Sequence, residues 1–153
     1  MSIPPGSRAT KSVDTFRMAH GISAQIRAPA ARIWSLLTNA AEFPRWNSTV
    51  TQIEGEIALG KKIVVRVPSS PRPFTLTVSE LEPEKRMVWK SGAFPMFKGE
   101  RTFLLVPLSD GSTEFCMDEV ISGLMLPLIK SSLPDFGLMF QRYADDLTRA
   151  AEK

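Results

Sequence analysis

The sequence predicts an α+β fold, in which six or seven strands follow one another and helices occur only near the beginning and the end of the chain. Two observations indicate this order. Between residues 50 and 121, apolar residues repeatedly alternate with polar ones, a pattern typical of strands with one buried face. Between residues 136 and 150, apolar residues recur at helical spacing instead. Strands and helices that are segregated in this way exclude a fold of alternating strand–helix units.

A strand and two short helices are predicted before residue 47. The strand covers residues 15–27, where apolar and polar residues alternate. The first helix follows Pro29, which suits a first turn because its missing N–H needs no partner there. The apolar face of this helix consists of Ala30, Ile33, Trp34 and Leu37. We expect Asn39 to end the first helix in a left-handed conformation, and Pro44 to end the second.

The segment Ile26–Asn47 resembles the opening of the START-like (SRPBCC) superfamily of polyketide cyclase/dehydrase-like proteins. The shared pattern is a strand, Ala28-Pro29, Ile33-Trp34, a short helix and Pro44-Arg45-Trp46. With the later strands, Gly123 and a long terminal helix, the resemblance covers about residues 20–152. It implies a helix-grip fold, in which an antiparallel sheet of six or seven strands curls around the long C-terminal helix. It also implies a cavity between the sheet and that helix.

Six further strands are predicted at residues 50–53, 61–67, 74–78, 86–91, 97–106 and 112–121. The last two form a hairpin around the three-residue loop 109–111. Residues whose numbers sum to 220 then lie opposite each other, so Arg101 and Glu119 become direct partners on the inner face of the sheet. Each buried charge needs the other. The pair is either a polar anchor for a ligand carbonyl or hydroxyl, an acid/base pair, or a purely structural ion pair.

The C-terminal segment is predicted to have two parts. Residues 124–136 are apolar nearly all round and contain Pro127 and Pro134, so we expect a bend near Pro134 and a contribution to the cavity roof. Residues 136–150 form the long helix. The residues expected to face water on that helix and just after it are Arg142, Asp145, Asp146, Arg149 and Glu152.

Composition limits the possible functions. The chain has 153 residues, 43% of them hydrophobic and 23% charged, as expected for one globular domain. We expect residues 1–14 to form a tail or arm and residues 15–153 to form the domain. A net charge of +3 without a basic run gives no support for nucleic acid, and no apolar stretch is long enough for a membrane span. A single cysteine, Cys116, excludes an internal disulfide and predicts a cytoplasmic location.

The sequence carries no motif for a metal, a cofactor or a catalytic triad. No His/Cys cluster has metal-ligand spacing. His20 is the only histidine and has no nucleophile motif beside it. Residues 55–62 approach a phosphate-binding loop, but Lys62 replaces its Ser/Thr and a strand follows. Cys116 is predicted on the outer face as an inert thiol.

The chain contains seven Met, nine Phe and three Trp, and several of them fall in expected loops. These side chains predict that the protein binds a hydrophobic or amphipathic small molecule. The proposed wall and anchor residues are Trp46, Val65, Phe74, Leu76, Met87, Trp89, Arg101, Phe103, Met117, Glu119, Phe136, Phe140 and Tyr143. A first alternative is a polyketide cyclase- or dehydratase-like enzyme, with Arg101, Glu119 and Tyr143 as candidate catalytic residues. A second is a protein-interaction module similar to chaperone activators of the same fold. An oligomer is compatible with all three.

Overall fold

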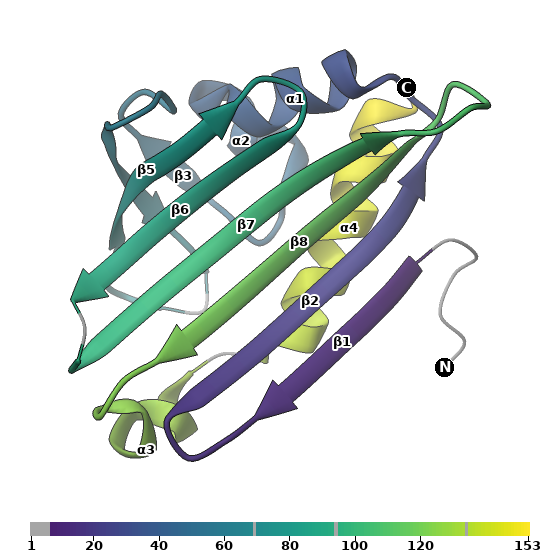
Figure 1. Cartoon of the computed structure of the whole chain (residues 1–153). Coiled ribbons are helices and arrows are strands. Elements are labelled where there is room, and N and C mark those ends of the chain that lie inside the picture. The colour runs from purple at the N-terminus through teal and green to yellow at the C-terminus, as the bar shows by residue number, and fades with distance from the viewer. Residues whose placement is uncertain (1–6, 69, 94, 134) are drawn as a thin grey trace.

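The chain forms one twisted antiparallel sheet with helix α4 lying across one of its faces (Figure 1). The computed structural model describes residues 7–68, 70–93, 95–133 and 135–153. The strands are β1 (Ser7–Val13), β2 (Arg17–Ile26), β3 (Gln52–Glu54), β4 (Lys62–Arg66), β5 (Phe74–Glu82), β6 (Arg86–Ala93), β7 (Phe97–Pro107) and β8 (Thr113–Ser122). The α-helices are α1 (Ala30–Thr38), α2 (Phe43–Trp46), α3 (Leu126–Ile129) and α4 (Phe136–Ala151). Short 3₁₀ helices cover Ala40–Glu42 and Lys130–Ser132.

The sheet has eight strands in the order β1-β2-β8-β7-β6-β5-β4-β3, one more than the upper limit that the sequence predicted. The additional strand is β1, which lies inside the predicted arm and pairs with residues 18–24 of β2. Its sequence has no apolar face, and its described side chains are exposed, so alternation could not reveal it. As an edge strand it carries Arg8 and Lys11, charges that hinder pairing with a further chain.

The strand register brings three polar residues into one row. In the β7–β8 hairpin Arg101 lies opposite Glu119, as the loop length predicted. On the other side of β8, Glu119 lies opposite His20 of β2. Since β7, β8 and β2 are neighbours, the three residues follow one another across the sheet.

The predicted first helix is present, but Asn39 and Pro44 do not have the roles that were expected of them at the ends of the first two helices. Helix α1 buries Ala30, Ile33 and Leu37. Asn39 has φ −99° and ψ 94°, so the helix ends in an extended residue and not in a left-handed one. Pro44 lies in the first turn of α2, where its missing N–H costs nothing, and so it begins that helix instead of ending it.

The C-terminal segment is divided into α3, a 3₁₀ turn and α4, in keeping with the predicted break. Pro134, where the bend was expected, lies outside the described residues. The carboxylate of Asp135 caps α4 by accepting the backbone N–H of Leu138 at 3.2 Å. Asp146 was expected to face water but is buried, because its carboxylate accepts both the N–H and the hydroxyl of Ser48 at 2.7 Å.

The core lies between the inner face of the sheet and α4. Phe103 and Phe115 from β7 and β8 pack there with Tyr143 and Leu147 from α4, and all four are buried. Among the described residues, no helix combines the length and apolar character that crossing a membrane requires.

Candidate functional site

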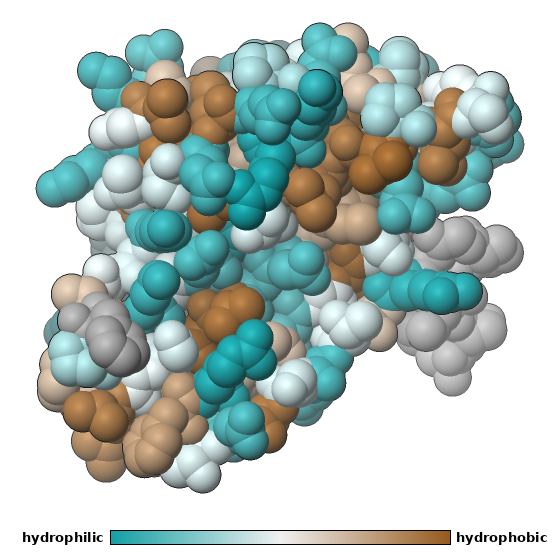
Figure 2. Space-filling model, in the orientation of Figure 1, coloured by the Kyte–Doolittle hydropathy of each residue, from teal (hydrophilic) through white to brown (hydrophobic). Residues whose placement is uncertain are grey.

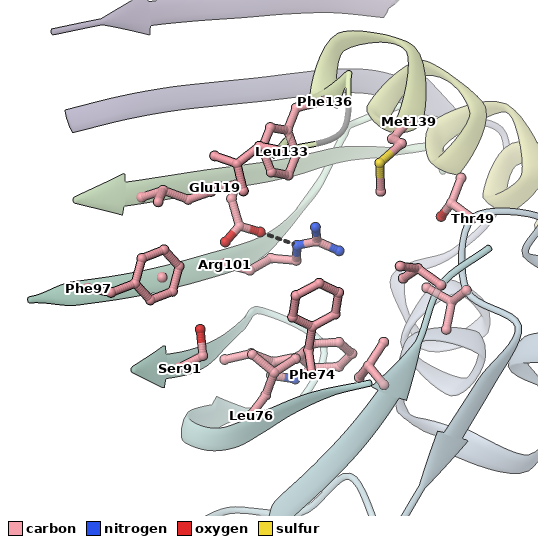
Figure 3. A pocket seen from close by; sticks show the side chains of 16 residues that line it. Thr49, Phe74, Leu76, Ser91, Phe97, Arg101, Glu119, Leu133, Phe136 and Met139 are labelled. Atoms are coloured by element: carbon pink, nitrogen blue, oxygen red, sulfur yellow. Dashed lines mark hydrogen bonds and ion pairs between the residues drawn. The ribbon is translucent and has the colours of Figure 1, made fainter. Parts of the chain in front are cut away.

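A partly open pocket of about 120 Å³ lies between the inner face of the sheet and the beginning of α4 (Figure 3). Its wall is mostly apolar, with side chains from β4 to β8 on one side and from residues 133–139 on the other. The lining residues are Thr49, Val50, Val65, Val67, Phe74, Leu76, Trp89, Ser91, Phe97, Gly99, Arg101, Glu119, Ile121, Leu133, Phe136 and Met139. Such a wall suits an apolar ligand group.

Among the described residues that line the pocket, only Arg101 and Glu119 are charged. The Nε of Arg101 donates to Oε1 of Glu119 at 2.7 Å, and the side chains are 16% and 14% exposed. The guanidinium carbon of Arg101 also lies 5.3 Å from the ring centroid of Phe140, which adds a cation–π contact. The pair follows directly from the β7–β8 register and is enclosed by apolar side chains.

The terminal nitrogens of Arg101 are free for a ligand. Figure 3 shows them pointing away from Glu119 and toward the side of the pocket where Thr49 and Met139 lie. Among the described residues, neither terminal nitrogen has a hydrogen-bond partner. The pocket therefore offers N–H donors at one point of a mostly apolar wall.

His20 extends the polar row beyond the pocket, and the sequence did not reveal this role. It is 8% exposed, its Nε2 has no hydrogen-bond partner among the described residues, and its ring centroid lies 5.1 Å from that of Phe136. Burial lowers the pKa of His20 below 6.5, and the charge of Lys11 adds to this effect. The charges of Asp135 and Glu119 act in the opposite direction without reversing it.

Seven of the proposed wall and anchor residues line the pocket. They are Val65, Phe74, Leu76, Trp89, Arg101, Glu119 and Phe136. Met87, Phe103, Met117 and Phe140 lie outside it, at most 2% exposed in the packed core. The reason is that α4 fills this part of the trough with its own large side chains, so the cavity is confined to the part beside the start of α4.

Trp46 and Tyr143 also lie outside the pocket. Trp46 borders a separate surface hollow between α1, α2 and the C-terminus. Tyr143 is 1% exposed, and burial raises the pKa of its phenol. Its hydroxyl has no hydrogen-bond partner among the described residues, and its ring stacks on that of Phe115 at 6.3 Å. Of the three candidate catalytic residues, the structure thus brings only Arg101 and Glu119 together.

Nine lining residues were not among the proposed wall residues, although the sequence pattern around some of them could have indicated a place in the wall. Leu133 belongs to the apolar segment 124–136 that was expected to contribute to the cavity roof, and Met139 follows Phe136 by almost one helical turn. Ser91 and Gly99 are small or polar and lie directly opposite each other on β6 and β7. No apolar pattern could assign these two to a cavity.

Other reactive groups do not gather at the site. Among the described residues, no three His, Cys, Asp or Glu side chains converge as metal ligands would. Burial raises the pKa of Cys116 to about 11, and Glu114 and Asp118 add to the effect. The thiol therefore stays protonated at neutral pH.

The fold is shared with solved structures of low sequence identity. A START superfamily protein from Mycobacterium smegmatis is 19% identical, with a TM-score of 0.67 over 88% of this chain and 97% of that one. A conserved protein of unknown function from Enterococcus faecalis is 17% identical, with a TM-score of 0.68 over 95% and 78% of the two chains. Truncated norcoclaurine synthase from Thalictrum flavum is 14% identical, with a TM-score of 0.65 over 90% and 95%.

These likenesses establish a common architecture, the helix-grip fold that the sequence predicted. No curated protein matches the sequence. A family model does match, and it describes polyketide cyclases, dehydrases and lipid transport proteins and covers residues 21–152, nearly the whole chain. The chain therefore belongs to the polyketide cyclase/dehydrase and lipid transport family of the START-like superfamily.

Proposed function

We propose that the protein binds a hydrophobic or amphipathic small molecule in the pocket between the sheet and α4. The observation that carries the proposal is a mostly apolar wall that contains one partly buried arginine, whose terminal nitrogens lack a partner among the described residues. The apolar part of a ligand gains free energy from leaving water, and a ligand oxygen supplies the missing acceptor. The cytoplasmic location and the small-molecule partner predicted from the sequence are part of this proposal.

The size of the pocket limits what it can enclose. A volume of about 120 Å³ is close to that of a cavity that holds one benzene ring. A single ring or a short branched chain therefore fits, and a longer ligand must extend from the open side of the pocket. Enclosing a larger molecule requires Leu133, Phe136 or Met139 to move. Leu133 lies between α3 and α4, and the other two residues lie in the first turn of α4.

Binding of the neutral fluorescent probe N-phenyl-1-naphthylamine tests this proposal. We expect saturable binding to the wild type, and native mass spectrometry of the freshly purified protein should detect any retained ligand. Replacing Glu119 with Gln should change the probe affinity more than the free energy of unfolding, because the amide still accepts from Arg101. Loss of stability with unchanged binding would assign the pair a structural role. Absence of saturable binding in the wild type would reject the proposal.

Catalysis is the second candidate, supported by the same free nitrogens of Arg101. Donors aimed at a ligand carbonyl stabilise an enolate or a tetrahedral oxyanion, which cyclisation and dehydration of polyketides both involve. Of the lining residues that the structure describes, Glu119 alone has a carboxylate that could accept a proton. An enzyme of this class should consume a poly-β-ketone thioester and lose that activity in both Arg101→Met and Glu119→Gln.

The protein-interaction module has less support. It requires a continuous apolar patch on the outer face of the sheet. Figure 2 shows hydrophilic side chains spread over the visible face, with hydrophobic ones scattered between them. Charged residues on the outer face include Lys62, Arg66, Arg86, Lys90 and Lys98.

A further inference from the structure

The pocket is electrically balanced before any ligand enters. The positive charge of Arg101 is matched by Glu119 at 2.7 Å, and no other lining residue in the described part of the chain is charged. His20 lies next to Glu119 in the sheet, but it adds no charge at neutral pH because burial lowers its pKa. The two terminal nitrogens of Arg101 thus offer hydrogen bonds without offering net positive charge.

This balance separates two kinds of ligand that share the same shape. A ketone, ester or aldehyde oxygen accepts from the free nitrogens and leaves the pocket neutral. A carboxylate makes the same hydrogen bonds but leaves one uncompensated negative charge in a mostly apolar wall, close to the carboxylate of Glu119. An unpaired buried charge is costly, and like charges brought together oppose binding further.

We infer that the site selects neutral carbonyl-bearing ligands against carboxylates, and that Glu119 is the residue that sets this preference. The inference rests on the proposed function and specifies the ligand class of that site. It also predicts that the preference reverses when Glu119 loses its charge, because a ligand carboxylate then becomes the counter-ion of Arg101.

Two ligands of matching shape test the inference. These are 4-phenylbutan-2-one and 3-phenylpropanoate, and both compete against N-phenyl-1-naphthylamine at pH 7.5. We expect the wild type to bind the ketone at least about tenfold more tightly than the acid. In Glu119→Gln the acid should bind at least as tightly as the ketone. The matched control is Glu114→Gln on the same strand, which removes an exposed carboxylate from the opposite face and should leave the wild-type ratio unchanged.

If Glu119→Gln does not fold, the negative charge can be removed from the ligand instead of from the protein, and the test remains valid. Methyl 3-phenylpropanoate should bind the wild type about as tightly as the ketone. Equal affinity of the wild type for ketone and acid would overturn the inferred selectivity and leave the proposed function standing, since the probe and both ligands would still bind. An unchanged ratio in a folded Glu119→Gln would overturn the role of Glu119. Failure of the wild type to bind the probe would overturn both.

Discussion

His20 is the single residue whose burial has the clearest consequence for stability. Its ring packs against Phe136 and Phe140, and the charged groups that act on it are Lys11 of β1, Glu119 of β8 and Asp135 before α4. Burial and the charge of Lys11 lower its pKa below the ordinary 6.5, and the charges of Asp135 and Glu119 offset this effect only in part. The unfolded chain therefore takes up a proton at a higher pH than the folded chain does.

The contribution of His20 to stability is accordingly complete above about pH 6.5 and is lost as the pH falls toward the lowered pKa of the folded state. We expect the melting temperature of the wild type to fall between pH 7.5 and pH 5.5. The fall should be smaller in His20→Gln, which cannot titrate. Thermal unfolding followed by circular dichroism measures both slopes, and identical slopes would show that His20 is not responsible.

The pairing of two residues across a short loop was predictable, whereas the pairing of residues on strands distant in sequence was not. The loop at 109–111 specified the register of Arg101 and Glu119, because few residues separate the two strands. His20 meets Glu119 through the β2–β8 pairing, which joins segments about a hundred residues apart. No periodicity within either segment encodes that pairing, so His20 could not be predicted to lie beside the site.

Among the structural elements, the junction between β8 and α3 closes the end of the sheet next to the pocket. Gly123 lies there with φ +130°, and a Cβ at this position would be 2.4 Å from the carbonyl oxygen of Met96. Its N–H donates to the carbonyl oxygen of Phe16 at 3.0 Å. The β1–β2, β6–β7 and β8–α3 connections therefore meet at Gly123.

Replacing Gly123 with Ala should destabilise the protein by about 3 kcal/mol, since it combines an unfavourable φ with a backbone collision. Gly111→Ala is the matched control, because Gly111 also has a positive φ of 87° but no atom lies within 4 Å of its added Cβ. It should cost only about 1 kcal/mol. Urea unfolding compares the two, and equal losses would mean that the contact with Met96 relaxes freely.

The elements that the sequence predicted well are those with one buried and one exposed face. Strands β4 to β8 and the apolar faces of α1 and α4 follow their periodicity closely. Strand β1 buries neither face, and Asp146 is buried through a hydrogen bond to a loop remote in sequence, so hydropathy could indicate neither. The extent of the cavity could not be predicted for a similar reason, because it depends on how far the side chains of α4 fill the trough.

At the scale of the whole molecule, the proposed function depends on a space that the fold leaves unfilled. The sheet curves over α4, and large side chains such as Phe140, Tyr143 and Leu147 occupy most of the interior. The remaining pocket is about the size of one aromatic ring. If this space holds the ligand, an aromatic side chain placed in it should compete with the ligand while leaving the rest of the fold intact.

Ser91→Phe places a phenyl ring in that space. Ser91 lines the pocket from β6 and lies opposite Gly99, which has no side chain of its own to resist a larger neighbour. An aromatic residue beside a cross-strand glycine is a favourable pairing in sheets. We expect the free energy of unfolding to stay within about 1 kcal/mol of the wild type, since cavity filling offsets the strain of the new ring. Probe affinity should fall at least about tenfold.

Thr75→Phe is the matched control, because it adds the same ring to β5 at an exposed position outside the pocket lining. It should leave probe binding unchanged and thereby separate occupation of the cavity from a general effect of added hydrophobicity. A folded Ser91→Phe that binds the probe as tightly as the wild type would place the ligand elsewhere on the molecule. In that case Arg101 and Glu119 would be a structural ion pair in a void without a ligand.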